Sequence, residues 1–315
     1  MEVLCADIGG TNTRLCAWSA SAGLYAEHTF RSEEFGDVAA PIRRWLDETG
    51  VQPDRACLGI AGPVIGGRCR TTNLPWVVEA DGLRDAFGFP FRLVNDFHAA
   101  ARGIGGLGVR GRVKIAGGEP VAGSPVVVMG PGTGLGEAIV AGDTVLAGEG
   151  GHSDFGPANA RELRFAAWRI AQVGRVDWED VLSGTGLVSL ARFWFEDSGR
   201  VIPRELQAPD APAWVVAECP EVVAWFCELL GAEAGNLAMK VLPLGGVYLA
   251  GGIAPRILPQ LNEGGFYQRF MAKGRSSHAI STVPIWVVTH SGLGLLGAAR
   301  EAELWARAEA EGKTG

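Results

Sequence analysis

Short apolar runs alternate with glycine-rich or polar turns along the whole chain, and longer stretches carry apolar residues at helical spacing. Short runs bounded by turns are typical of buried strands, and the longer period is typical of helices. We expect strands at residues 3–8, 13–18, 24–30, 56–60, 91–94, 125–129, 135–140, 247–250 and 284–289. We expect helices at residues 38–48, 79–87, 97–102, 161–172, 213–219, 221–242 and 295–310. Strands that alternate with helices favour an α/β fold.

A pattern of strand, glycine turn and strand occurs twice in the chain. The first strand ends in Gly9-Gly10-Thr11-Asn12, and the strand at 125–129 runs into Gly130-Pro131-Gly132-Thr133-Gly134. The two turns lie about 120 residues apart, which predicts two structurally related halves and not a short repeat. A separate hairpin is expected at residues 62–68.

Length and charge limit the possible functions. A chain of 315 residues exceeds one ordinary core, so two domains are expected. The net charge of -7 argues against a nucleic-acid-binding surface, which needs an excess of Lys and Arg. A nucleotide remains possible as a ligand, because backbone N–H groups and a metal ion can hold phosphates.

The cysteines and the N-terminus predict a cytoplasmic protein. No uninterrupted apolar run reaches the ~18 residues that a membrane span needs, so no membrane partner is expected. Met1-Glu2-Val3-Leu4 lacks the basic start of a signal peptide and is instead expected to enter the first strand. The six cysteines form no C-x-x-C pair and are expected to be reduced thiols.

The two glycine turns could each hold phosphate. At the first turn, Asp7 stands at the end of a strand, two glycines allow close backbone approach, and Thr11 and Asn12 add donors. This equipment suits a magnesium-phosphate group, although a plain hairpin with an acidic flank is equally compatible. The second turn could wrap a terminal phosphate with Gly132, Thr133 and Gly134. A strand follows each turn, so neither is a Walker loop or a Rossmann turn.

Two further glycine segments carry weaker signals. Gly251-Gly252 follows a strand, and its bare backbone would allow a flat ring such as adenine to lie on it. The segment 103–108 matches G-x-G-x-x-G, but it follows a predicted helix and not a strand. We therefore reject it as a dinucleotide site and expect a flexible connection there.

Polar residues at Asn95-Asp96 and in the segment 148–152 could bind a sugar. A carboxylate at a strand end can accept a hydroxyl proton while the neighbouring amide binds another hydroxyl. The alternative is that Asp96 caps the helix that follows. Glu149 and His152 stand in a glycine-rich loop where they could bind adjacent hydroxyls, or could be solvated surface charges.

Taken in order, these segments resemble the bacterial-type glucokinase family, sugar kinases of the actin-like ATPase superfamily. The resemblance covers nearly the whole chain. It rests on segments 7–12, 93–97, 132–136, 148–155, 179–184, 249–253 and 292–297. No cysteine lies between Cys69 and Cys219, which is similar to the zinc-free branch of these kinases.

The resemblance implies the fold, the reaction and the site. The fold would be a two-domain actin-like ATPase (ribonuclease H-like) sugar kinase fold with a cleft between the domains. We expect a small domain at 1–110 plus 294–315 and a large domain at 111–293. The reaction would be ATP-dependent phosphorylation of glucose on its 6-hydroxyl, with Mg²⁺ as cofactor. Alternatives are another hexose (mannose, fructose or N-acetylglucosamine) and a non-catalytic sugar sensor. A homodimer is expected.

The resemblance also assigns roles to residues. Asp96 would be the catalytic base, and the sugar ligands would be Asn95, Asp96, Glu149, His152 and Glu179. The nucleotide phosphates would contact Gly9, Gly10, Thr11, Asn12, Gly132, Thr133 and Gly134, and Gly251 and Gly252 would lie beside adenosine. Asp7 would serve Mg²⁺ through water. Thr72-Asn73 matches a segment near the sugar pocket.

One residue departs from the family pattern. Glu137 follows the second glycine turn, where an apolar residue is expected. Its side chain could face solvent. If it faced the γ-phosphate instead, it would repel it.

Overall fold

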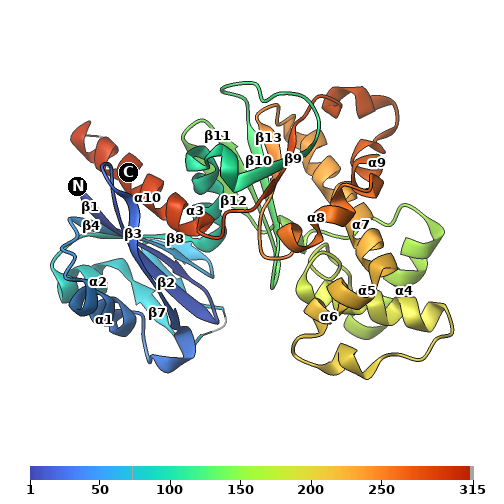
Figure 1. Ribbon diagram of the computed structural model, residues 1–315, viewed down its shortest axis with the longest axis horizontal. Helices are drawn as coiled ribbons and strands as arrows, with labels where there is room; N and C mark the ends of the chain where they lie inside the picture. The colour runs from blue at the N-terminus through green and yellow to red at the C-terminus, as the bar shows by residue number, and fades with distance from the viewer. Residues whose placement is uncertain (73, 313–315) are drawn as a thin grey trace. The chain divides into compact units, whose positions relative to one another are not determined.

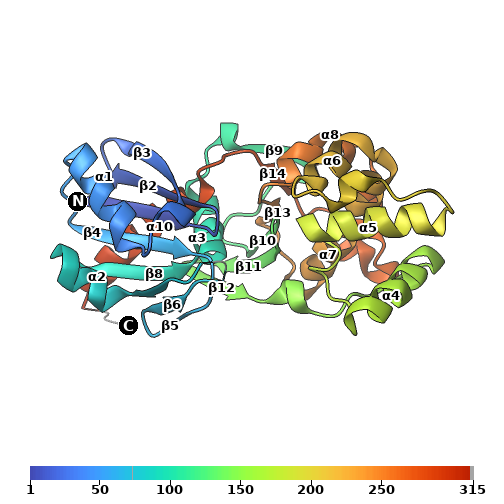
Figure 2. The same cartoon turned by 90° about the horizontal axis from the view of Figure 1, so that it is seen from below.

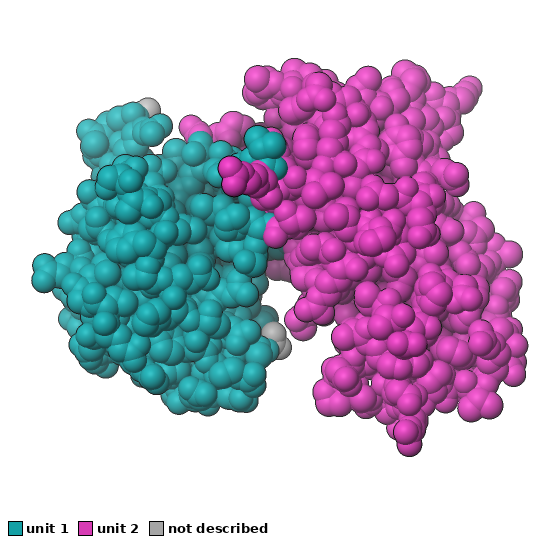
Figure 3. Space-filling model, in the orientation of Figure 1, with its two compact units in different colours: residues 1–109, 290–315 teal, residues 110–289 magenta. Residues whose placement is uncertain are grey.

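The computed structural model describes residues 1–72 and 74–312. The chain divides into two compact units (Figure 3), Met1–Val109 with His290–Gly315 and Arg110–Thr289. Each unit is built around its own central sheet.

The first unit contains a five-stranded sheet of order β3-β2-β1-β4-β8. Strands β1, β2 and β3 are antiparallel neighbours, whereas β1, β4 and β8 run parallel. Because the carboxyl ends of parallel strands meet at one edge, Asp7 and Asn95 are brought to the same edge of the sheet. The strands are β1 (Glu2–Ile8), β2 (Asn12–Ser19), β3 (Gly23–Arg31), β4 (Arg55–Ile60) and β8 (Phe91–Asn95).

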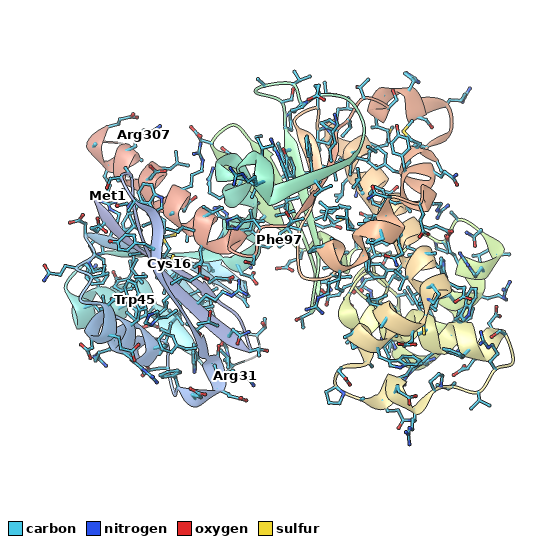
Figure 4. The ribbon with its side chains drawn as sticks, in the orientation of Figure 1. Met1, Cys16, Arg31, Trp45, Phe97 and Arg307 are labelled. Atoms are coloured by element: carbon cyan, nitrogen blue, oxygen red, sulfur yellow. The ribbon has the colours of Figure 1, made fainter. Side chains whose placement is uncertain are left out.

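Helices cover both faces of this sheet (Figure 1). On one face, Ile42 and Trp45 of α1 are wholly buried, and the Trp45 indole N–H donates to the Ala26 carbonyl at 2.8 Å (Figure 4). The other face packs Cys5 and Cys16 under alanines of the last helix. All six cysteines are free thiols, as expected. The helices are α1 (Ala39–Thr49), α2 (Ala80–Phe87), α3 (Asp96–Gly103) and α10 (Leu293–Ala310).

A small sheet of order β5-β6-β7 extends the first unit. Its first two strands form the hairpin expected at residues 62–68, and the turn residues Gly66 and Gly67 have φ of 57° and 73°. Positive φ at both turn positions is the geometry that glycine adopts without strain. The strands are β5 (Val64–Ile65), β6 (Arg68–Arg70) and β7 (Val77–Glu79).

Helices α3 and α10 pack backbone against backbone through two glycines. A Cβ at Gly297 would overlap the carbonyl oxygen of Ala99, and a Cβ at Gly103 would overlap the carbonyl oxygen of Leu293. Glycine is required at both positions because any side chain would push the helices apart. The expectation of a flexible connection at 103–108 is therefore wrong at its first residue, since Gly103 ends α3 and is buried against α10.

A buried carboxylate reinforces this helix pair. Glu301 of α10 accepts hydrogen bonds from Arg102 at 2.8 Å and Arg92 at 3.2 Å, and its Oε2 lies 3.4 Å from the His98 ring. Burial opposes ionisation of Glu301, but His98 and Arg102 outweigh it and lower its pKa to about 2. The ion cluster therefore fixes α3, which begins at Asp96, to the last helix of the chain.

The second unit repeats the strand plan of the first. Its six-stranded sheet has the order β12-β11-β10-β13-β14-β9, in which β10, β11 and β12 are antiparallel neighbours and β10, β13 and β14 are parallel. The first five strands match the order and direction of the first sheet, which confirms the two related halves. The strands are β9 (Arg112–Ala116), β10 (Val126–Pro131), β11 (Leu135–Ala141), β12 (Thr144–Gly148), β13 (Gly246–Leu249) and β14 (Ile285–Val288).

The helices of the second unit lie against one face of its sheet (Figure 2). Helix α7 is long and apolar enough to cross a membrane, but 78% of its apolar window is buried by the rest of the protein, which is typical of a core helix. The sequence patterns missed β7, β9, β12, α5, α8 and α9. Helix α5 opens with Gly184-Thr185-Gly186, which resembles a loop, but Ser183 caps it by accepting from the Gly186 N–H at 3.0 Å. The helices are α4 (Ala160–Val173), α5 (Gly184–Asp197), α6 (Ala211–Glu218), α7 (Pro220–Val241), α8 (Leu258–Leu261) and α9 (Gly265–Met271).

Replacing Gly297 by Ala tests the contact between α3 and α10. Helix propensity alone would make Ala more stable than Gly by up to about 1 kcal/mol. The overlap with the Ala99 carbonyl predicts the opposite sign, a loss of about 1–3 kcal/mol in the free energy of unfolding measured with urea. Gly106→Ala is the control, because nothing lies within 4 Å of a Cβ there. A Gly297→Ala variant as stable as the wild type would contradict the proposed packing.

Candidate active site

Asp7 lies near the end of β1, where its carboxylate packs against the start of α10. A Cβ at Gly294 would lie 3.1 Å from the Asp7 carboxylate. Burial and the charge of Asp96 raise the pKa of Asp7 to about 6, and the charge of Arg14 opposes the rise. Arg14 is held in turn by the Ser291 carbonyl at 2.7 Å. The fold therefore brings two carboxylates close enough to repel each other, an arrangement that a cation would stabilise.

The first glycine turn is closed by backbone hydrogen bonds. The Gly9 N–H donates to the Asn12 carbonyl at 2.9 Å, and Ser32 donates through its hydroxyl to the Gly9 carbonyl at 2.9 Å and through its N–H to the Thr11 carbonyl at 3.0 Å. Thr11 and Asn12 are exposed. The structure thus places the predicted phosphate contacts on an accessible turn beside Asp7.

The helix after β8 is capped by Asn95, so the alternative in which Asp96 caps this helix is wrong. The Asn95 Oδ1 accepts from the Phe97 N–H at 2.9 Å and the His98 N–H at 3.1 Å, and its Nδ2 donates to the Gly62 carbonyl at 3.2 Å. Asp96 is the first helical residue, and its Oδ1 also accepts from the Phe97 N–H at 2.8 Å. Phe97 is labelled in Figure 4. Asn95 therefore holds the strand end and the helix start that carry Asp96.

The second glycine turn rests on the segment that carries Glu179. The Gly132 N–H donates to the Gly134 carbonyl, and the Gly184 N–H donates to the Gly132 carbonyl, both at 2.8 Å. The Glu179 Oε2 accepts from the Leu135 N–H at 2.8 Å. A Cβ at Gly134 would overlap that carboxylate, so only glycine allows it to approach. Thr133 is exposed at the tip of the turn.

The predicted sugar residues of the second unit lie together. His152 belongs to the short helix η4 (Gly150–His152), and its ring Nδ1 lies 3.2 Å from the Asp177 carboxylate. The hydrogen bond that the His152 ring can donate to Asp177 raises the pKa of His152, and the charges of Glu179 and Glu149 contribute to the rise. Glu149, His152 and Glu179 therefore form one polar cluster, as expected of residues that bind the same ligand.

Glu179 connects the glycine-rich loop 148–152, the predicted sugar loop, with the glycine turn 130–134, the predicted phosphate turn. Its backbone N–H donates to the Gly151 carbonyl at 2.8 Å, while its side chain accepts from Leu135. The sequence indicated a sugar contact for Glu179 and did not predict this second role. A change at Glu179 will therefore affect both loops.

Asp177 is a functional candidate that the sequence analysis missed. It is mostly buried, with 15% of its side chain exposed, and it orients the exposed imidazole of His152. It lies in an isolated β-bridge with Asp154, directly before the turn that carries Glu179, and no local sequence pattern indicated its role. Asn73, predicted near the sugar pocket, lies outside the described residues.

Glu137 is buried, so the expectation that it could face solvent is wrong. Only 6% of its surface is exposed, and its carboxylate packs against Gly150, where a Cβ would overlap it. The Oε1 atom is buried without a hydrogen-bond partner among the described residues. Burial and the charge of Glu233 raise the pKa of Glu137 to about 7, and Lys240 opposes the rise. The side chain lies under the loop that carries Glu149 and His152.

Gly251 approaches the second glycine turn closely. It has a φ of 76°, and a Cβ there would lie 2.6 Å from the Pro131 carbonyl oxygen. The position therefore requires glycine for both conformation and space. Gly252 is exposed, with nothing within 4 Å of a Cβ. The second unit thus offers open backbone beside its glycine turn, at the position of the predicted adenosine contact.

Comparison with known proteins gives consistent matches along the chain. A family model named Glucokinase matches residues 4–304. A glucokinase of Nostoc punctiforme is 33% identical over an alignment that covers 94% of this chain and 97% of the relative. The solved structure of a glucokinase from an Antarctic psychrotroph has a TM-score of 0.84 and 32% identity, and covers 96% of this chain and 99% of that one. A glucokinase of Balamuthia mandrillaris, solved in complex with glucose, shares the fold with a TM-score of 0.76 and 22% identity, covering 96% of this chain and 93% of that one.

Glu137→Gln tests the buried carboxyl under the sugar loop. Between its ordinary pKa of 4.5 and its raised pKa of about 7, Glu137 is ionised in the unfolded chain but still protonated in the folded one. The free energy of unfolding therefore falls as the pH rises through this range. Each pKa unit is worth about 1.4 kcal/mol. Gln removes this loss, and the variant should gain up to about 3 kcal/mol relative to wild type between about pH 5 and about pH 8 in urea unfolding.

The control for this experiment is Glu263→Gln, at an exposed position of the same unit. This variant should change the free energy of unfolding by the same amount at about pH 5 and at about pH 8. Parallel pH profiles for wild type and Glu137→Gln would show that Glu137 does not titrate in this range.

Proposed function

The chain belongs to the glucokinase family, and on that premise we propose that it transfers the γ-phosphoryl group of ATP to the 6-hydroxyl of glucose. The family model spans nearly the whole chain, and the resemblance predicted from the motifs is thereby confirmed. The observation that supports the proposed mechanism most directly is the pair of carboxylates at one sheet edge, Asp7 and Asp96, whose charges repel each other.

Asp96 is proposed as the base of the reaction. The oxygen of the sugar 6-hydroxyl attacks the γ-phosphorus, the bond to the β-phosphate oxygen breaks, ADP leaves, and the hydroxyl proton passes to the Asp96 carboxylate. Phosphoryl transfer needs positioning and charge neutralisation more than covalent chemistry. Asn95 serves this step by capping α3, which sets the position of Asp96.

Asp7 is proposed to serve Mg²⁺, through water. Carboxylate oxygens are the ligands that Mg²⁺ prefers, and the raised pKa of Asp7 fits a site that lacks a compensating positive charge. When bound, the ion would neutralise the charge of the phosphates. The turn at Gly9, Gly10, Thr11 and Asn12 is proposed to contact these phosphates through its N–H groups.

The second unit is proposed to supply further contacts to both substrates. Glu149, His152 and Glu179 are proposed as sugar ligands, together with Asn95 and Asp96. The phosphates of ATP are assigned to Gly132, Thr133 and Gly134, and its adenosine to Gly251 and Gly252. The glucose bound to the Balamuthia mandrillaris relative supports a hexose as ligand. A substrate panel with mannose, fructose and N-acetylglucosamine tests the choice of glucose. Cytoplasmic location and a homodimer belong to the same proposal.

Asp96→Asn tests the base. The amide keeps the size and can still bind a hydroxyl, but it cannot accept a proton, so kcat should fall by about 10²–10⁴-fold with little change in sugar binding. The measurement is a coupled assay with glucose, ATP and Mg²⁺, together with calorimetry of glucose binding. Asp37→Asn, in the same unit but outside the proposed site, is the matched control. A variant that retains near-normal kcat would remove Asp96 from the mechanism.

His152→Ala tests the sugar ligands without disturbing the phosphate turn. Loss of a hydrogen bond to a ligand costs about 1–3 kcal/mol, so glucose should bind about 10-fold more weakly or worse, while nucleotide binding stays unchanged. Glu179→Ala should weaken both, because it also removes the acceptor of the Leu135 N–H. Calorimetry with each ligand separates the effects. Equal losses for glucose and nucleotide in His152→Ala would argue against a specific sugar contact.

A further inference from the structure

The second unit contains a small polar pocket whose lining includes none of the residues assigned to sugar or nucleotide. Its volume is about 250 Å³, below the roughly 300–1,000 Å³ of sites for drug-sized ligands. It is bounded by α7, the end of α9 and the segment after the sugar loop. The residues that define it are Gly156, Trp178, Asn236, Arg269, Ala272 and Lys273.

Two cationic side chains line this pocket, and carboxylates outside the lining act on both: Glu162 pairs with Arg269, and the charge of Glu233 acts on Lys273. Arg269 and Lys273 line it, and no Asp or Glu is among its lining residues. Arg269 donates to the buried Glu162 carboxylate at 2.9 Å, but its Nε is buried without a partner among the described residues. A buried donor without a partner is costly.

Lys273 lacks a carboxylate partner within ion-pair distance in the part of the chain that the structure describes. Its Nζ donates to the Ala232 carbonyl at 2.8 Å and to the Asn236 Oδ1 at 2.5 Å, both uncharged acceptors. Burial lowers the pKa of Lys273, as expected for a desolvated ammonium group. An anion beside it would stabilise the charged form.

We propose that this pocket binds a small oxyanion of the phosphate or carboxylate class between Arg269 and Lys273. Two cations with unused hydrogen-bonding capacity suit such a group, and the volume suits a small anion better than a nucleotide. The site goes beyond the proposed kinase function and does not depend on it.

The pocket is connected to the sugar loop along two routes. Its wall residue Trp178 donates its backbone N–H to the Ser153 carbonyl at 3.1 Å, immediately before Glu179. On the other side, Asn236 accepts from Lys273 and donates to Glu233 at 2.8 Å. The charge of Glu233 in turn acts on Glu137, which lies under Gly150. An anion in the pocket is therefore placed to influence sugar affinity.

Ala272 offers a test that leaves the internal hydrogen bonds intact, because it is exposed and lines the pocket. Ala272→Glu adds a negative charge, and Ala272→Gln is a neutral control of equal size. Calorimetry would titrate inorganic phosphate, and malonate in a second arm, into protein saturated with glucose, Mg²⁺ and AMPPNP so that the proposed substrate sites are blocked.

We expect wild type and Ala272→Gln to bind one of the two anions saturably, and Ala272→Glu to bind it at least about 10-fold more weakly. The anion that binds more tightly identifies the class. Lys273→Met should weaken binding as well, whereas Lys114→Met, on β9 outside the pocket, should not. Absence of saturable binding, or equal binding by the Glu and Gln variants, would overturn the proposal.

Discussion

The first unit depends on the contact between the backbones of α3 and α10. Gly103 and Gly297 have no side chains that would separate the helices. Glu301 adds an ion cluster in which its interactions with His98 and Arg102 outweigh the desolvation of its carboxylate. Helix α3 begins at Asp96, and α10 begins beside Asp7. The position of both proposed site carboxylates is thus tied to one packing interaction, although Glu301 and Gly297 do not belong to the proposed site themselves.

Both units present their glycine turn in the same way. In each, an antiparallel pair carries a glycine turn at its tip, and parallel neighbours bring further residues to the same sheet edge. The surroundings of the two turns differ. The first turn adjoins Asp7, whose carboxylate is repelled by the charge of Asp96, whereas the carboxylate beside the second turn, Glu179, accepts a hydrogen bond from the Leu135 N–H. The start of α5 also supports the second turn, because the Gly184 N–H donates to the Gly132 carbonyl. The repeated plan therefore allows the two units to be proposed for different parts of one reaction.

Much of the fold could be predicted because its strands are short apolar runs separated by glycines. The elements that were missed have weak local signals. Helix α5 has a buried face that includes Leu187, Leu190 and Phe193, but it opens with glycines that are typical of a loop. Strand β12 is mostly exposed and shows no clear buried face. The burial of Glu137 could not be predicted, because it depends on the pairing of β11 with β12, after which Gly150 leaves room for a carboxylate. Likewise, the roles of Asp177 and Glu179 depend on hydrogen bonds between segments that are separated by 25 and 44 residues.

The location of α10 has a consequence for how the chain is made. The second unit is continuous in sequence and can complete its core once residue 289 has left the ribosome. The first unit cannot, because one face of its sheet is covered by Leu295, Ala298 and Ala302, which are synthesised after the whole second unit. The hydrogen bond from Arg14 to the Ser291 carbonyl can form only after Ser291, 277 residues later, has been synthesised. Until α10 has been synthesised, the N-terminal sheet therefore exposes an apolar face, and a transiently exposed apolar surface favours aggregation.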